Sequence, residues 1–185
     1  MTFSDWGLIA YNDALQQQKT LFQAKIGHKM CGTSCDDVLV FCEHYPVFTL
    51  GRNGVAGNML LPVEQLRRMH IDLVRTDRGG DITFHGPGQV VGYPIIDLET
   101  YGLGLKHYIY LLEETLIRTL AEWHICGERM DGATGVWVHQ ADNTWKKIAA
   151  IGVRCSHYIT MHGFALNVNT DLHYSVKNKD NAGAQ

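Results

Sequence analysis

Residues 78–89 read Arg-Gly-Gly-Asp-Ile-Thr-Phe-His-Gly-Pro-Gly-Gln, and five of these twelve residues are glycine or proline. Glycines let the backbone approach a ligand closely and expose its amide groups. Arg78 can anchor a carboxylate or phosphate, and His85 can exchange a proton near neutral pH. A surface hairpin loop with a structural histidine explains the same composition. Composition alone therefore leaves a ligand-binding loop and a plain turn equally open.

The bulk properties are those of an ordinary globular protein. The chain has 185 residues, of which 45% are hydrophobic and 19% charged, enough for one core. A net charge of -3 gives no argument for nucleic acid or an anionic membrane as a partner. No signal peptide is visible at the start, and no apolar run approaches the roughly 20 residues that span a bilayer. Five cysteines without a regular framework suit a reducing compartment, so we expect a cytoplasmic protein.

Hydrophobic periodicity predicts the secondary structure around the loop. Helices are expected at 11–26, at 63–70 after Pro62, and at 105–123. Strands are expected at 37–42, 71–75, 89–98, 135–138, 147–154 and 159–169. Pro94 favours an edge position or a bulge for the strand that contains it. Hairpin connections follow the long helix, so we predict an α+β fold with a mixed β-sheet flanked by helices, in a single domain over 1–175.

Four sequence blocks resemble the octanoyltransferases of lipoate biosynthesis, the lipoate-protein ligase B family. The first is 78–89 followed by Tyr93, which matches the order Arg-Gly-Gly-x-x-Thr-aromatic-His-x-x-Gly-Gln position by position. The others are 43–52, 147–154 and 162–169, and the similarity runs from about residue 6 to about residue 172. The resemblance implies a fold related to biotin and lipoate protein ligases, and an acyltransferase that uses no cofactor.

The resemblance also implies a reaction. The family moves an octanoyl group from acyl carrier protein onto a cysteine, and then to a lysine of a lipoyl domain in a lipoate-dependent enzyme. This is the first step of lipoate biosynthesis. The expected partners are octanoyl-acyl carrier protein, the lipoyl domains of 2-oxoacid dehydrogenases and the H protein of glycine cleavage, with no nucleic acid and no membrane. The alternative is a catalytically inactive relative that binds acyl groups or lipoyl domains; an ATP-using ligase ranks behind both, because nothing marks a nucleotide site.

Site residues follow from the same resemblance. Small or apolar groups would line an acyl pocket, which suits an eight-carbon tail whose burial is worth roughly 0.8 kcal/mol per CH₂. The implied lining residues are Arg78, Gly79, Gly80, Asp81, Ile82, Thr83, Phe84, His85, Ala150, Ile151, Gly152, Gly163, Phe164 and Ala165. Lys147 matches the family's catalytic lysine, whose ammonium stabilises the nucleophilic thiolate. His162 is interpreted as a hydrogen-bonded structural residue, and a supporting place at the pocket stays open for it. No histidine spacing indicates a metal site.

The chain departs from the family pattern after residue 172. The family's nucleophile is a cysteine in a Pro-Cys-Gly turn about ten residues further on, whereas 173–185 contains neither cysteine nor proline. Residues 176–185 are polar and are expected to form an atypical, disordered tail. The family's closing helical segment is expected to be missing, which would leave apolar surface exposed. Truncation, a frameshift and true loss of the nucleophile all remain open.

The cysteines that are present offer weak substitutes. Cys155 is nearest in sequence to the pocket blocks, but a buried free cysteine commonly behaves as a small hydrophobe. Cys31 and Cys35 have no second ligand pair that would make a metal site, so free thiols are expected.

Overall fold

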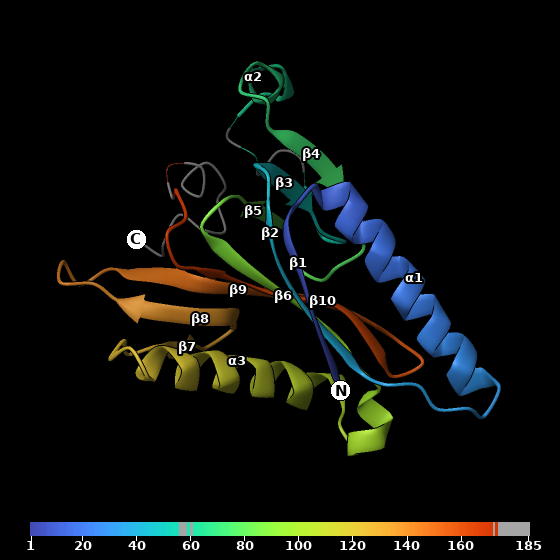
Figure 1. The fold of residues 1–185 in the computed structure, drawn as a ribbon. Coiled ribbons are helices and arrows are strands. Elements are labelled where there is room, and N and C mark those ends of the chain that lie inside the picture. The colour runs from blue at the N-terminus through green and yellow to red at the C-terminus, as the bar shows by residue number, and fades with distance from the viewer. Residues whose placement is uncertain (56–58, 60, 172, 174–185) are drawn as a thin grey trace.

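The computed structural model describes residues 1–55, 59, 61–171 and 173, and its centre is a seven-stranded mixed sheet (Figure 1). The strand order is β1-β2-β6-β10-β9-β8-β7, with β1 parallel to β2 and the other pairs antiparallel. These strands are β1 (Thr2–Ile9), β2 (Val38–His44), β6 (Gln89–Ile95), β7 (Glu128–Met130), β8 (Ala133–His139), β9 (Trp145–Ser156) and β10 (Ile159–Asn167). The predicted α+β class is confirmed. The predicted tail, 176–185, lies outside the described residues.

Two long helices cover opposite faces of this sheet. Along β10, Ala165 packs in the cluster that contains Ala14 of α1 (Tyr11–Met30). Its neighbours Phe164 and Leu166 pack in the cluster of α3 (Leu105–Ala121). Successive side chains of a strand point to opposite faces, so α1 and α3 lie on opposite sides. No helix of the described residues is long and apolar enough to cross a membrane.

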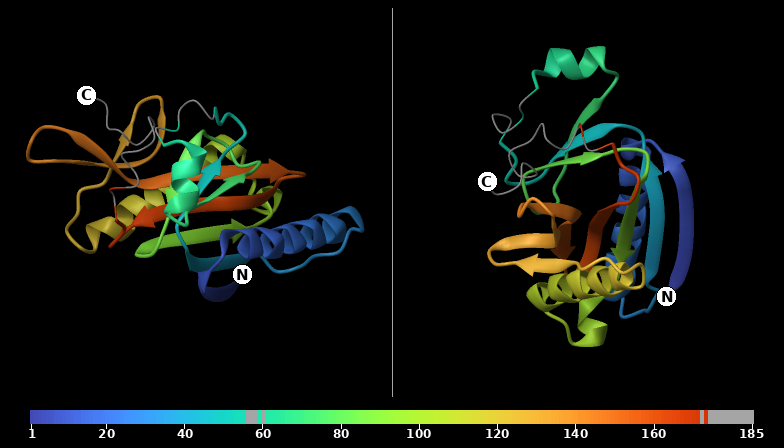
Figure 2. Two further views of the ribbon diagram at one scale, coloured as in Figure 1. Left: turned by 90° about the horizontal axis from the view of Figure 1, so that it is seen from above. Right: turned by 90° about the vertical axis from the view of Figure 1, so that its left-hand side faces the viewer.

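A smaller sheet projects from the main one, with the short helix α2 at its outer end (Figures 1 and 2). It contains β4 (Asp72–Arg75), β3 (Val47–Leu50) and β5 (Ile82–His85) in that order, with α2 (Val63–Arg68) between β3 and β4 in the chain. The prediction of a loop throughout 78–89 is therefore wrong at its centre. Residues 82–85 form β5, because Ile82 and Phe84 bury their side chains beside Phe48.

Pro94 does not lie at an edge, so that part of the prediction is wrong: β6 lies between β2 and β10. The β6–β10 register pairs Gly92 with Phe164, and continuing it places His162 opposite Pro94. Proline has no N–H to donate. The backbone N–H of His162 leaves the ladder and donates to Gln18 of α1, and His162 adopts φ 61°. Further along, the hydroxyl of Thr160 accepts from Ile96 N–H and donates to the Pro94 carbonyl. The proline is tolerated because side chains replace the missing ladder bonds.

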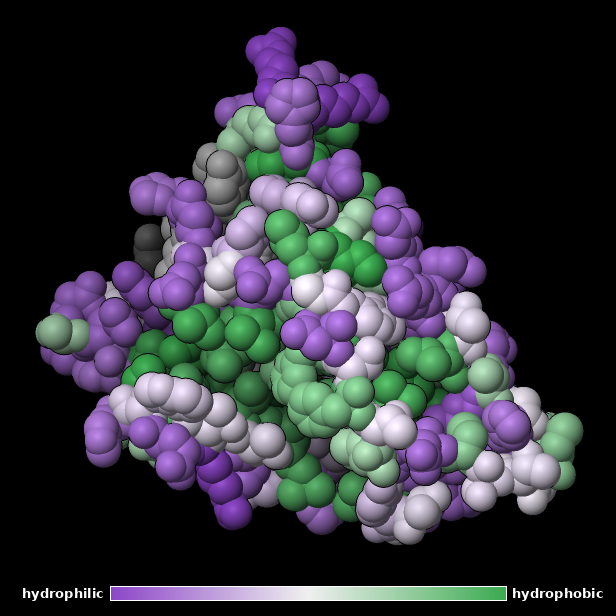
Figure 3. All heavy atoms as spheres, in the orientation of Figure 1, coloured by the Kyte–Doolittle hydropathy of each residue, from purple (hydrophilic) through white to green (hydrophobic). Residues whose placement is uncertain are grey.

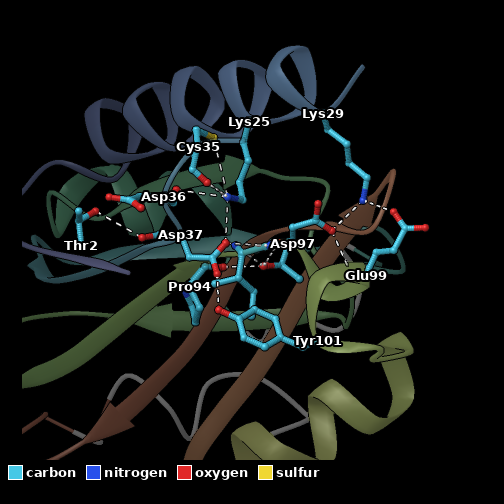
Figure 4. Close-up of polar contacts among 12 residues, drawn as sticks. Thr2, Lys25, Lys29, Cys35, Asp36, Asp37, Pro94, Asp97, Glu99 and Tyr101 are labelled. Atoms are coloured by element: carbon cyan, nitrogen blue, oxygen red, sulfur yellow. Dashed lines mark hydrogen bonds and ion pairs between the residues drawn. The ribbon is translucent and has the colours of Figure 1, made fainter. Parts of the chain in front are cut away.

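A charged cluster ties the end of α1 to two loops (Figure 4). The Lys25 ammonium lies 2.9 Å from an Asp37 carboxylate oxygen, and these side chains are only 7% and 11% exposed. It also donates to two backbone carbonyls, those of Cys35 and Asp36. Asp37 in turn accepts from the Tyr101 hydroxyl of η2 (Leu98–Tyr101). The remaining hydrogen-bonding groups of the pair are thus satisfied, as a buried ion pair requires, and we interpret the cluster as structural.

The ladder break leaves no room for a side chain at Gly163. A Cβ there would collide with the Gly92 carbonyl oxygen and lie 2.6 Å from Pro94 Cδ. We expect Gly163→Ala to lower the free energy of unfolding by about 1–3 kcal/mol, the usual range for overpacking. In α1, Gly27 has open space around its Cβ position, so Gly27→Ala should raise stability by roughly 0.5–1 kcal/mol. Urea denaturation of both variants measures these changes. If Gly163→Ala left the free energy of unfolding unchanged, the inferred steric crowding around residue 163 would be wrong.

Candidate active site

A cavity lies between α1, β5 and the centre of the main sheet. Its wall is formed by Tyr11, Arg78, Thr83, His85, Val91, Tyr93, Ala150, Gly152, His162, Gly163, Phe164 and Ala165. The free space is about 20 Å³, which holds roughly one water molecule. An acyl chain can therefore enter only if part of the wall moves.

The structure brings three segments of the implied acyl pocket to this cavity. From the implied set, Arg78, Thr83, His85, Ala150, Gly152, Gly163, Phe164 and Ala165 line the wall. The others, Gly79, Gly80, Asp81, Ile82, Phe84 and Ile151, lie off it. Ile151 faces α3 because it alternates with Ala150 and Gly152 along β9. Gly152 is required by the approach of the loop: a Cβ there would lie 2.8 Å from the Gly79 carbonyl oxygen.

Arg78 holds the loop in place. Its buried guanidinium donates to the carbonyls of Thr49 at 2.8 Å and Asp81 at 3.0 Å, and to the Thr49 hydroxyl at 2.9 Å. These bonds join the turn after β4 to the end of β3. The sequence suggested an anchor for an anionic ligand, whereas the described contacts of this guanidinium are with backbone and hydroxyl oxygens.

The hydrogen bonds of His85 define which of its nitrogens carries the proton. Gln89 Nε2 donates to the Phe84 carbonyl and to Asn167 Oδ1, which fixes the orientation of the Gln89 amide. Gln89 Oε1 then lies 2.7 Å from His85 Nδ1 and can only accept, so Nδ1 is protonated. Burial is the main cause that lowers the pKa of His85 to about 3. The imidazole is therefore neutral at physiological pH.

His44 is held in the same tautomer below the cavity. Its Nδ1 donates to the Ile9 carbonyl at 2.9 Å, and its Nε2 accepts from the Tyr93 hydroxyl at 2.6 Å. Burial lowers the pKa of His44, although the Ile9 bond opposes this shift. The Tyr11 ring stacks on His85 at 5.6 Å between centroids. Sequence reasoning did not select Tyr11, because nothing in the helix pattern distinguishes it from a core residue.

His162 reaches the cavity from β10 because of the ladder break. Its Nε2 lies 2.9 Å from Asp77 Oδ1, and Arg154 pairs with the other oxygen of the same carboxylate. The bond from His162 is the main cause that lowers the pKa of Asp77 to about 2. Burial lowers the pKa of His162, with Asp77 opposing it. His162 is a hydrogen-bonded residue, as the sequence suggested, and it also lies on the wall, although regular strand alternation would have turned it towards α3.

Lys147 lies on β9 outside the cavity wall, with Nζ 4.7 Å from the centroid of the Trp137 ring. The register of β8 and β9 shifts between Val136 and Trp137. Cys155 is eight residues further along β9, roughly 26 Å away at ~3.3 Å per residue. It packs in the α3-side cluster with Leu98, and burial raises the pKa of its thiol. Cys155 therefore cannot act together with Lys147.

A second, larger hollow lies on the α3 side of the sheet, where apolar side chains gather in the surface view (Figure 3). This groove has a volume of about 910 Å³, and its lining is apolar apart from a few groups such as Thr115, Thr119 and Asn167. Trp123 is 69% exposed at its rim. Apart from Phe164, no implied pocket residue lines it. The histidines and tyrosines of the site lie at the other cavity, and no group of three or more metal-binding side chains occurs in the described part of the chain.

Known proteins resemble this chain over nearly its whole length. A family model described as the lipoyl protein ligase A/B catalytic domain matches residues 10–181. An octanoyltransferase of Parabacteroides distasonis is 51% identical over 173 residues, 93% of this chain and 78% of the relative. An octanoyltransferase of Bacteroides fragilis is 53% identical over 171 residues, 92% of this chain and 77% of the relative.

Solved structures resemble the fold. A bipartite lipoate protein ligase of Thermoplasma acidophilum, studied with its E2 lipoyl domain, gives a TM-score of 0.68 at 15% identity. This match covers 92% of the present chain but 62% of that longer chain. A lipoate-protein ligase A bound with ATP gives 0.66 at 16% identity, covering 98% and 73% of the two chains. At such low identities these matches support the fold alone.

The neutral state of His85 predicts a pH dependence of stability. The unfolded chain protonates His85 near its ordinary pKa of about 6.5, whereas the folded protein does so only near 3. The contribution of neutral His85 to the free energy of unfolding is therefore fully present above pH 6.5. It is lost as the pH falls towards 3, by up to about 1.4 kcal/mol per pH unit. We expect the His85→Phe variant to be less stable than the parent protein at pH 7. Between pH 6.5 and 4, however, its free energy of unfolding should fall less than that of the parent protein.

Chemical denaturation across this pH range measures the slope. His107→Gln, at an exposed position of α3, is the matched control and should keep the slope of the parent protein. An equal slope in His85→Phe and the parent would contradict a buried neutral imidazole.

Proposed function

This chain belongs to the octanoyltransferases of the lipoyl protein ligase A/B family, and we propose that it takes an octanoyl group from acyl carrier protein for transfer to a lysine of a lipoyl domain. The observation that carries the proposal is the cavity beneath α1. It gathers residues from three of the four family-like blocks and combines small apolar groups with the uncharged imidazole of His85. Once part of the wall has moved to admit it, burial of an eight-carbon chain is favoured, since each buried CH₂ contributes roughly 0.8 kcal/mol.

The transfer itself requires a thiolate next to the bound acyl group. In thioester chemistry the cysteine attacks the carbonyl of the carrier thioester, and the acceptor amine then displaces that cysteine. Lys147 is proposed to stabilise the thiolate. Cys155 lies eight residues from Lys147 along β9, too far for the two side chains to act together, and the sequence has no cysteine after Cys155. We therefore propose that the chain as given binds the acyl group without forming the thioester intermediate.

An acyl-binding protein without catalysis is the second candidate, and the absent thiol is the observation that favours it. The two candidates share the same pocket and the same ligands. Lipoyl domains are the proposed protein partners on both readings, with acyl carrier protein as the donor. The five free cysteines support a reducing cytoplasmic location.

Restoring the thiol tests the proposed function. Counting ten residues on from the block at 167–172 leads to positions 181 and 182, so Asn181→Cys and Ala182→Cys are the variants to make. After incubation with octanoyl-acyl carrier protein, we expect no octanoyl adduct on the unmodified chain and an adduct on one of the variants. In that variant, Lys147→Met should abolish the adduct and Lys146→Met should retain it.

Intact-mass spectrometry with peptide mapping reads out the adduct. Binding of octanoyl-pantetheine to the unmodified chain, measured by calorimetry, is expected in either case. An adduct on Cys155 would contradict the assignment of the site, and failure to bind octanoyl-pantetheine would contradict the proposed function itself.

A further inference from the structure

We propose that His85 is a positioning residue of the acyl site that accepts a hydrogen bond from the N–H of the acceptor amine and of the amide product, and that Gln89 fixes it in this role. The inference rests on the proposed function, since it assigns a partner atom to one wall of the octanoyl cavity. It concerns which acyl compounds the site prefers.

The proton of His85 is fixed by groups that can only accept. The Phe84 carbonyl accepts from Gln89 Nε2 at 3.2 Å, so the amide of Gln89 cannot be reversed without placing two oxygens together. Asn167 Oδ1 accepts from the same nitrogen at 2.9 Å. Gln89 Oε1 must then receive the Nδ1–H of His85. A chain of hydrogen bonds from β10 through β6 to β5 thus leaves Nε2 of His85 with a lone pair and no proton.

This lone pair faces the cavity. His85 lines the cavity wall, and no hydrogen bond joins its Nε2 to another residue of the described chain. Since Nδ1 is bonded to Gln89, Nε2 is the ring nitrogen that remains for a ligand in the cavity. The stacked Tyr11 ring and the Gln89 bond hold the imidazole in this orientation.

An unprotonated Nε2 in a mostly apolar wall favours ligands that can donate a hydrogen bond to it. A thioester or an ester has no N–H at the reacting carbonyl, whereas a lysine amine and the resulting amide do. A polar wall group that stays unpaired when a ligand binds weakens binding of that ligand. The wall thus favours the amine and the amide over the oxygen or sulfur ester.

In the transfer step, the acceptor nitrogen forms a bond to the acyl carbon while the carbon–sulfur bond breaks. The proton that the nitrogen loses goes to the departing thiolate, which leaves as a thiol. His85 accepts a hydrogen bond from the remaining N–H and takes no proton, consistent with the low pKa that burial gives it. It would orient the nitrogen lone pair towards the carbonyl.

Two small ligands of nearly equal shape test the proposal in the unmodified chain. N-Methyloctanamide carries the N–H, and methyl octanoate replaces it with oxygen. We expect the amide to bind about three- to tenfold more tightly, the range given by one neutral hydrogen bond. The Gln89→Met variant keeps the length of the side chain but loses the oxygen that accepts from His85 Nδ1. In this variant the ratio of amide to ester affinity should fall towards one. Gln140→Met, in the turn between β8 and β9, should keep it.

A second measurement does not depend on any variant folding. Nitrogen-15 spectra of the imidazole should show Nδ1 of His85 protonated and Nε2 bare in the unmodified chain at pH 7. An Nε2-protonated tautomer would overturn the inference, as would equal affinity for the amide and the ester. If both ligands bound equally well, the proposed octanoyl binding would stand and only this inference would fail. If neither ligand bound, the proposed function would fail together with this inference.

Discussion

The interruption of the β6–β10 ladder at Pro94 is the constraint on which the site depends. Proline cannot donate to the neighbouring strand, so the backbone opposite it is free to leave regular strand geometry. His162 does so, with φ 61°, and its N–H bonds to Gln18 of α1. The imidazole consequently lies on the α1 side of the sheet, where it meets Asp77. A break that would destabilise an ordinary central strand places the His162 side chain in the cavity wall.

The cavity wall combines apolar groups with a neutral histidine and the buried guanidinium of Arg78. His44 and His85 are each tied through Nδ1 to an oxygen that can only accept, and burial keeps both neutral. A neutral imidazole can face an apolar chain without desolvating a charge of its own. The charged side chains near this face have partners: Asp77 pairs with Arg154 and Lys25 pairs with Asp37. The Arg78 guanidinium, which lines the wall, donates to the carbonyls of Thr49 and Asp81.

The sequence predicted those elements whose pattern is local. The helix at 105–123 is α3 with two residues fewer, because its apolar residues repeat at intervals of three and four. β5 was missed, since its four residues stand among glycines and its partner β3 is distant in sequence. The edge position inferred from Pro94 failed because side-chain hydroxyls can replace ladder bonds.

Three of the four family-like blocks meet at the cavity, but the sequence could not tell wall residues from their neighbours. Strand alternation separates Gly152 from Ile151, and only the register settles which of them faces α1. The separation of Lys147 from Cys155 likewise becomes clear only when β9 is seen as one long strand. Tyr11 and His162 join the site through tertiary contacts that no short sequence pattern contains.

Locating a bound acyl chain would test the central claim, that the octanoyl group occupies the small cavity beneath α1 rather than the larger apolar groove beside α3. Nuclear Overhauser contacts can be measured between a carbon-13-labelled octanoyl amide and assigned methyl groups of the protein. We predict contacts with Ala150 and Ala165, which line the cavity. Contacts with Leu112, Leu116 and Ile148 in their place would put the chain in the α3 groove and contradict it.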